Sequence, residues 1–103
     1  MAEVNSRREV NQIAEVLKVI GHPIRLRIML KLAKKFCCVG EIWESLQLPQ
    51  AVVSQHLKIL KERGVLEARR EGTKVSYLIK DSMIRDLVTT LDKKCCASDK
   101  MSA

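Results

Sequence analysis

Two pairs of adjacent cysteines are the residues of this sequence whose type and spacing point most directly to chemistry. The first pair, Cys37 and Cys38, lies near the middle of the chain, and the second, Cys95 and Cys96, lies near its end. Thiolates are soft ligands that bind As(III), Sb(III), Cd(II), Zn(II) and Cu(I), and they are also the reactive form of cysteine in redox reactions. The sequence therefore offers two candidate sites for a soft ion or a thiol-reactive compound.

A second group of candidate residues belongs to a short amphipathic helix expected within residues 48–64. Its apolar stripe, Val53, Leu57 and Leu60, follows the i, i+4, i+7 spacing of a buried helix face. Polar side chains lie off that stripe, at Gln50, Ser54, Gln55 and Lys58. Amides and hydroxyls can pair with base edges, and ammonium groups neutralise phosphates. The pattern favours a helix that reads the major groove of DNA, although an ordinary solvated surface helix would also show it.

The segment that follows strengthens the DNA-binding interpretation. Residues 65–80 alternate apolar and polar on both sides of a glycine-containing turn at 71–73, which is the signature of a β-hairpin. Arg69, Arg70 and Lys74 cluster near its tip, where a β-ribbon can lie along a phosphate backbone. A reader helix followed at once by a basic hairpin predicts a winged helix-turn-helix, a mainly α fold with a β-hairpin wing.

The remaining periodic segments complete a single domain. The expected elements are helices over about 6–20, 23–34 and 40–46, an extended link over 36–39, and a last helix that begins after the N-cap Asp81. We expect three regions along the chain: an N-terminal arm over 1–7, one DNA-binding and dimerisation domain over 8–96, and a disordered tail over 97–103.

The first and last helices carry apolar stripes that predict a dimer interface. The last helix repeats Ile84, Leu87, Val88 and Leu91 at helical spacing, and this stripe has no obvious place in a core already closed by the reader domain. The first helix carries the matching stripe Val10, Ile13, Leu17 and Ile20. A chain of 103 residues buries only a modest fraction of its surface alone, which favours a homodimer built from these two helices.

The charge of the chain limits its possible partners. Lysine and arginine outnumber aspartate and glutamate by 19 to 12, a net charge of +7, which favours a polyanion such as nucleic acid or an anionic membrane. No apolar run approaches the roughly 20 residues that cross a bilayer, and the charged N-terminus is not that of a signal peptide. Aromatic residues make up only 3%, which argues against single-stranded nucleic acid and RNA. We therefore expect a cytoplasmic protein that binds double-stranded DNA and no membrane, with reduced cysteines.

Three motifs together resemble the ArsR/SmtB family of bacterial and archaeal repressors. They are GHPIRLRI at residues 21–28, LPQAVVSQHL at 48–57 and LEARREGTKVSY at 66–77. The resemblance covers roughly residues 8–96 and implies a homodimeric repressor that leaves an imperfectly palindromic operator when an inducer binds. By motif match, the family's groove-facing positions are Gln50, Ala51, Ser54 and Gln55. Ala51 replaces the usual serine, which removes one hydrogen bond.

The resemblance also bears on the inducer. Cys38 matches the first ligand of the family's Cys-x-Cys metal box, but Gly40 occupies the second position. The family's alternative zinc or cobalt site needs histidine on the last helix, which here has none. Some arsenite-responsive members instead carry a cysteine pair at the end of that helix, as Cys95 and Cys96 do. We therefore expect As(III) or Sb(III) as inducer, with Cys37, Cys38 or a small thiol as third ligand, and thiol oxidation or reactive sulfur as the alternative.

Other interpretations of the cysteines and the charge stay open. Cys95 extends an apolar stripe and could be a small packing residue, an explanation that suits Cys96 less well. A thiol oxidoreductase is disfavoured because no Cys-x-x-Cys occurs, and no nucleophile with a positioned base points to any other enzyme. A nucleoid-packaging protein would have a similar charge. Footprinting separates it from a regulator, which protects a discrete palindromic site.

Overall fold

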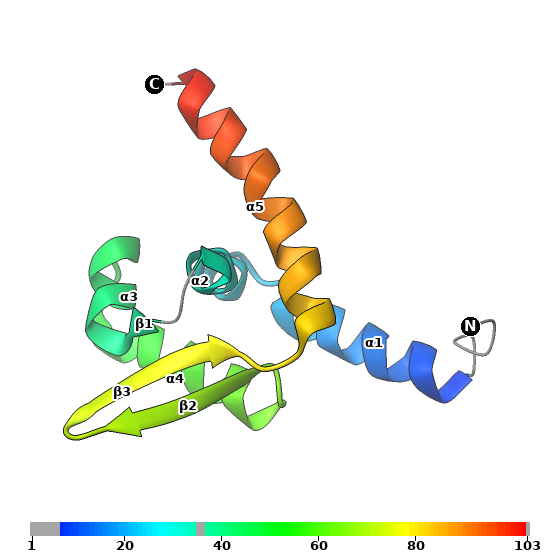
Figure 1. Cartoon of the computed structure of the whole chain (residues 1–103), viewed down its shortest axis with the longest axis horizontal. Helices are drawn as coiled ribbons and strands as arrows, with labels where there is room; N and C mark the ends of the chain where they lie inside the picture. Colours follow the sequence, from blue (N-terminus) through cyan, green and yellow to red (C-terminus); the bar gives the residue numbers. More distant parts are fainter. Residues whose placement is uncertain (1–6, 35–36, 103) are drawn as a thin grey trace.

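The computed structural model describes the backbone of residues 7–34 and 37–102, and the side chains of residues 9–34 and 38–93. Its elements in chain order are α1 (Arg7–Ile20), α2 (Pro23–Lys34), β1 (Cys37–Cys38), α3 (Val39–Leu46), α4 (Gln50–Glu62), β2 (Leu66–Glu71), β3 (Lys74–Ile79) and α5 (Ser82–Ser102). Helices α2, α3 and α4 gather beside the β-hairpin, while α1 and α5 extend from this body in different directions (Figure 1). This is the winged helix-turn-helix expected from the sequence.

The core lies where α2, α3 and α4 meet the base of the sheet. Its fully buried side chains are mainly aliphatic: Ile28, Met29, Ile42, Val53, Leu57, Leu60, Val65, Leu66, Ile79 and Val88. The three stripe residues of α4 belong to this core, as their spacing predicted. Burying a side chain of this size contributes about 1.5–3 kcal/mol, so α4 is held in place by one face while the other stays free.

The sheet has one strand more than the predicted hairpin. Strand β3 pairs with β2 on one side and with β1 on the other, antiparallel in both cases, in the order β1-β3-β2. The sequence predicted an extended link before α3 but not its pairing with the wing. A two-residue turn joins β2 to β3, and Gly72 adopts a φ of 66° there, which a residue with a side chain rarely does.

The apolar stripe of α5 differs from the prediction, which assigned all of it to a dimer interface. Ile84 and Val88 are buried in the core, since the first half of α5 packs against α2. Leu87 and Leu91 stay exposed, at 40% and 38%. The stripe of the last helix is therefore divided: one edge packs into the core of the domain, and the other is exposed.

The start of α5 agrees with the prediction, and its end lies beyond the predicted one. Asp81 caps the helix as expected, since its Oδ1 accepts a hydrogen bond from the backbone N–H of Met83 at 2.7 Å. The helix then continues to Ser102, where the sequence had suggested disorder from residue 97. No glycine or proline follows Cys96 to stop it. The side chains from residue 94 onward lie outside the described part.

Candidate nucleic-acid interface

Helix α4 presents a polar face that the rest of the domain leaves uncovered. Val53, Leu57 and Leu60 are buried, whereas the residues predicted to contact DNA are all exposed: Gln50, Ala51, Ser54, Gln55 and Lys58. The first turn of α4 contains no acidic residue that would repel phosphate. The partial positive charge at a helix N-terminus also favours an anion there. The face thus combines hydrogen-bonding groups near its start with a lysine further along.

The turn between α3 and α4 is fixed by local hydrogen bonds. Gln47 closes α3 in the left-handed conformation, with φ 56° and ψ 44°. Its backbone N–H bonds the carbonyl of Glu44, and Arg27 of α2 donates from Nη2 to the carbonyl of Leu46 at 3.1 Å. Because α3, the turn and α2 are tied together here, the direction in which α4 leaves the turn is well defined.

The wing lies beside α4, since β2 packs against that helix. Arg69, Arg70 and Lys74 are exposed, as the sequence predicted. Arg69 lies opposite Ser76 and Arg70 opposite Val75 in the hairpin. Neighbouring residues of a strand point to opposite faces, so the two arginines do not share one face of the wing. Arg69 and Arg70 therefore project from opposite faces of the hairpin.

A cluster of two histidines and an arginine, which the sequence did not predict, lies where α4 packs against α2, away from the exposed polar face of α4. Arg25 of α2 donates from Nε to Nδ1 of His56 on α4 at 3.3 Å, and from Nη1 to the carbonyl of Val19 at 3.1 Å. The ring of His22 lies against that of His56, with centroids 4.8 Å apart. Burial, His22 and Arg25 together lower the pKa of His56 below its ordinary value. His22 and His56 stand far apart in the sequence, so only the unusual Gly-His-Pro turn could have drawn attention to one of them.

Of the predicted thiol sites, the structure describes Cys38 in detail. Cys38 is half-buried, immediately precedes α3, and pairs with Ser76 of the wing. The Oε1 atom of Glu41 accepts hydrogen bonds from the backbone N–H of Cys38 at 3.2 Å and from its thiol at 3.6 Å. This thiol therefore lies at the junction of the wing strand and the first helix of the helix-turn-helix.

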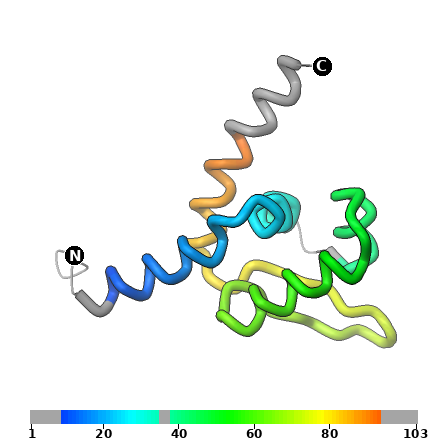
Figure 2. Tube along the Cα trace, turned by 180° about the vertical axis from the view of Figure 1, so that it is seen from behind, coloured from blue at the N-terminus to red at the C-terminus, as the bar shows by residue number. Residues whose placement is uncertain are grey.

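The other three cysteines are located by their backbone alone. Cys37 pairs with Tyr77 in the sheet, and Cys95 and Cys96 belong to α5. Helix α5 points away from the sheet (Figures 1 and 2). Among the residues whose side chains are described, no three histidine, cysteine or carboxylate groups are placed to hold a metal ion.

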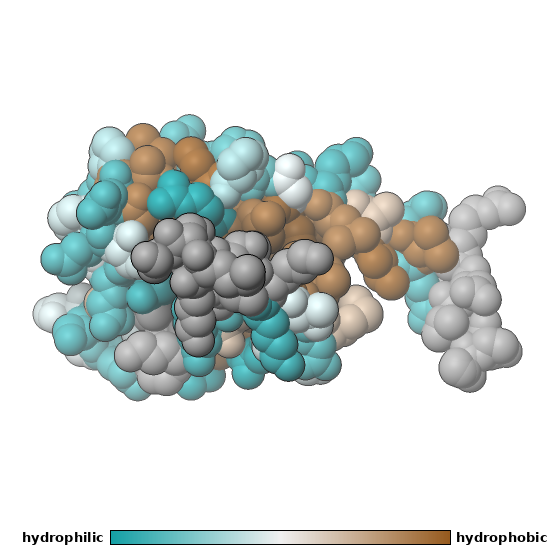
Figure 3. Space-filling view, turned by 90° about the horizontal axis from the view of Figure 1, so that it is seen from above, coloured by the Kyte–Doolittle hydropathy of each residue, from teal (hydrophilic) through white to brown (hydrophobic). Residues whose placement is uncertain are grey.

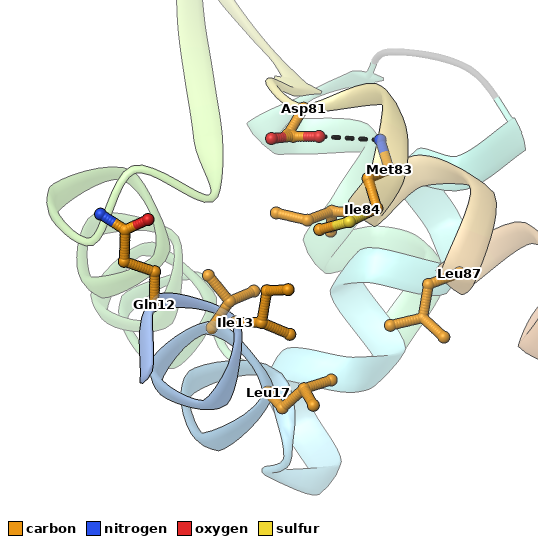
Figure 4. A pocket seen from close by; sticks show the side chains of 8 residues that line it. Gln12, Ile13, Leu17, Asp81, Met83, Ile84 and Leu87 are labelled. Atoms are coloured by element: carbon orange, nitrogen blue, oxygen red, sulfur yellow. Dashed lines mark hydrogen bonds between the residues drawn. The ribbon is translucent and has the colours of Figure 1, made fainter. Parts of the chain in front are cut away.

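An apolar groove of about 460 Å³ separates α1 from the start of α5. Ile13 and Leu17 of α1 face Ile84 and Leu87 of α5 across it (Figure 4). On the surface, apolar residues form a band that continues along α1 (Figure 3). Val10, Ile13 and Leu17 are 51%, 40% and 46% exposed, which is unusual for large aliphatic side chains gathered on one face.

A pair of helices joined by a tight turn, with a basic hairpin beside the second helix, defines a winged helix-turn-helix DNA-binding protein. The family described as bacterial regulatory protein, arsR family, matches residues 22–68. An uncharacterized HTH-type transcriptional regulator, MJ1325 of Methanocaldococcus jannaschii, is 40% identical over 78% of this chain and 91% of its own. The transcriptional repressor PagR of Bacillus anthracis is 41% identical over 77% and 80%. The chain belongs to the arsR family, the ArsR/SmtB regulators that its motifs resemble.

Solved structures agree with this assignment. HlyU from Vibrio cholerae N16961 superposes with a TM-score of 0.82 at 26% identity, covering 88% of this chain and 99% of that one. Its reduced form gives 0.80 at 27% identity, covering 86% and 94%. The homodimeric winged helix-turn-helix DNA-binding domain of Mb0332 from Mycobacterium bovis gives 0.74 at 29%, covering 94% and 91%. The relatives named above as regulators point away from an enzyme. Over the described residues, no helix is long and apolar enough to cross a membrane.

Proposed function

We propose that this protein is a homodimeric transcriptional repressor that leaves its operator when a thiol-reactive inducer acts on its cysteines. The observation that carries the proposal is the division of α4 into a buried aliphatic stripe and an exposed polar face beside a basic wing. Such a helix is anchored firmly enough to present side chains to a DNA groove. The protein would act in the cytoplasm, where the DNA is.

Reading and anchoring are assigned to different residues of α4 and the wing. Gln50, Ser54 and Gln55 supply the hydrogen-bonding groups for base edges, while Ala51 offers only a methyl group, which suits a thymine methyl. Lys58 and the wing residues Arg69, Arg70 and Lys74 supply cations for the phosphates. A single short helix contacts few base pairs, so a second copy on a palindromic site is needed for specificity.

The homodimer is supported by the groove between α1 and α5. Its exposed aliphatic residues lie on both helices that the sequence assigned to the interface, and they include Leu17 and Leu87. An isologous contact would cover the same patch on both chains. The homodimeric state named for Mb0332 is consistent with this arrangement.

For the inducer, we favour arsenite or antimonite bound by the thiolates of Cys95 and Cys96. Trivalent arsenic takes three thiolates, so Cys37, Cys38 or a small thiol would complete the site. Lys93 and Lys94 stand beside the pair and favour its thiolate forms. Because α5 borders the dimer groove, an ion at its end would bias the relative position of the two reading heads.

A second candidate is a repressor that responds to thiol oxidation or reactive sulfur. It is favoured by the similarity to HlyU, one structure of which is described as reduced. It is also favoured by the position of Cys38 between the wing and α3, where a modification would disturb both elements. In this candidate, modification of a cysteine thiol by an oxidant or by reactive sulfur, rather than binding of an ion, releases the protein from its operator.

The test starts from DNA that the protein itself selects from a random-sequence pool. Fluorescence anisotropy of the selected duplex, against a scrambled duplex of equal length, should show tighter binding by about 10³-fold or more. Arsenite should then release the operator in the presence of excess 2-mercaptoethanol, whereas release by an oxidant or polysulfide should be reversed by that thiol. Equal affinity for the two duplexes would contradict a repressor and indicate a packaging protein.

A further inference from the structure

We propose that Arg25 is a positioning residue that couples helix α1 to the reader helix α4, through the carbonyl of Val19 and the imidazole of His56. The inference rests on the proposed function, because it assigns a route from the dimer surface to the DNA-reading face. It concerns residues that neither contact DNA in that proposal nor belong to the thiol sites.

The first contact of Arg25 is with the end of α1. Val19 belongs to the last turn of α1, where backbone carbonyls have no partner within the helix. Arg25 Nη1 donates to this carbonyl at 3.1 Å. The charged donor strengthens the bond and complements the partial negative charge of the helix end. The end of α1 is thereby fixed to α2 at the junction that follows the exposed apolar face.

The second contact of the same guanidinium is with the reader helix. Arg25 Nε donates to Nδ1 of His56 at 3.3 Å. His56 stands next to Gln55, a residue of the reading face, and is itself half-buried against α2. A guanidinium is planar and rigid, so it relates its two acceptors by a fixed geometry that a flexible ammonium would not impose. A rotation of α1 about α2 therefore displaces the guanidinium and, with it, the contact to α4.

His22 holds the imidazole of His56 from the other side. Its own Nδ1 accepts a hydrogen bond from the backbone N–H of Ile24 at 3.1 Å, which fixes the ring at the start of α2. The rings of His22 and His56 lie 4.8 Å apart with planes inclined by 40°. The Nδ1 atom of His56 accepts a hydrogen bond from Arg25, so the ring of His56 is neutral with its proton on Nε2. The lowered pKa of His56 agrees with this state.

Together these contacts make one junction from three elements. Helix α1 carries the exposed aliphatic face Val10, Ile13 and Leu17, and α4 carries the reading face. Arg25 bonds to both through atoms of one rigid group. A change in how two chains meet through α1 thus reaches α4 as a change in orientation, without any contact between the dimer surface and DNA.

The test compares variants on the selected operator with a control that loses the same charge. Arg25→Met and His56→Leu remove the two sides of the contact. The control is Arg85→Met, because Arg85 also donates to a backbone carbonyl, that of Ile79, but on α5. Relative to this control, we expect each variant to lose about tenfold in operator affinity, with affinity for scrambled duplex unchanged.

Two further results distinguish positioning from a merely structural role. The double variant of Arg25→Met and His56→Leu should bind no more weakly than either single one, because both remove the same coupling. His56→Gln should recover affinity to within about threefold of the wild type, since an amide oxygen can accept from Arg25 Nε. Moving the two half-sites of the operator apart by one base pair should reduce binding affinity less for Arg25→Met and His56→Leu than for the wild type.

Each opposite result overturns the inference. Roughly hundredfold, additive loss in the double variant means that Arg25 and His56 act separately. Equal damage from His56→Gln and His56→Leu means that the acceptor is irrelevant. If the variants unfold, imidazole ¹⁵N spectra of the wild type decide: a protonated Nδ1 in His56 at neutral pH contradicts the contact. Failure of the wild-type protein to select any DNA sequence instead removes the proposed function, and the inference with it.

Discussion

Cys38 lies directly opposite Ser76 where β1 pairs with β3. Ser76 in turn lies opposite Arg69 in the hairpin, so one row across the sheet joins a thiol to a basic residue of the wing. Cys38 also precedes α3 and bonds the carboxylate of Glu41 in its first turn. A group added to this thiol would disturb the wing and the helix-turn-helix at the same time.

The thiol switch gives the first prediction. A variant with both Cys95→Ser and Cys96→Ser should bind the selected operator like the wild type but no longer release it with arsenite, because the thiolates are gone. Cys38→Ser is the matched comparison: it keeps a donor for Glu41, and a loss of release there shows that Cys38 joins the response. Anisotropy titrations measure both. Undiminished release of the double variant by arsenite and by oxidant would place the sensing site elsewhere.

The dimer gives the second prediction. Leu87→Asp should dissociate the homodimer at a cost of several kcal/mol, because the new carboxylate would be buried against apolar side chains. Asn11→Asp, an exposed position on α1, adds the same charge and should leave the dimer intact. Sedimentation or light scattering at micromolar concentration measures the mass. A monomeric wild type under those conditions would contradict the proposed homodimer.

The division between reading and anchoring gives the third prediction. Gln50→Ala or Ser54→Ala should cost roughly 1–3 kcal/mol on the selected operator and relax sequence preference at one position. Arg69→Ala, Arg70→Ala or Lys74→Ala should weaken specific and scrambled duplexes alike, and each residue that contacts a phosphate should lower the salt slope by about one. Wing variants that lose sequence preference but keep the wild-type slope would show that the two roles are reversed.

The titration of His56 gives the fourth prediction. The pKa of His56 in the folded protein lies below its ordinary value of 6.5, so the unfolded chain takes up a proton first as the pH falls. The stability contributed by neutral His56 is thus complete above about pH 6.5 and decreases as the pH falls toward the folded-state pKa. Urea unfolding between pH 7.5 and roughly pH 5 should show a steeper decline for the wild type than for His56→Gln. Parallel declines would mean that His56 is not the group responsible.

Periodic segments of the sequence were sufficient to predict most of the fold and which face of α4 is exposed. The stripe of Val53, Leu57 and Leu60 determines which side of α4 is buried, so the exposed side follows directly. Strand β1 was not predicted as a paired strand because two residues show no alternation. On α5, a single interface stripe was expected, whereas Ile84 is buried in the core and Leu87 is exposed, since periodicity gives a direction on a helix but not how deeply each side chain is covered.

The junction at Arg25 could not be predicted for another reason. Its contacts join residues of α1, α2 and α4 through a turn and a packing angle that no local pattern encodes. From the sequence alone, Arg25 and His56 could equally well be exposed to solvent and make no contact with each other. Only the packing of α4 on α2 brings His56 within reach of Arg25.

Because β3 is paired on both sides, the wing is the outer part of a sheet that runs directly into α3. The hairpin and the helix-turn-helix are therefore joined through the sheet, and we expect them to move together. In a dimer of such units, the position and orientation of one copy relative to the other remain to be adjusted. Successive base pairs along a DNA strand are about 3.4 Å apart, so a displacement of that size puts the second copy out of register with its half-site. A ligand far from the DNA needs to produce only a few ångströms of movement to end repression.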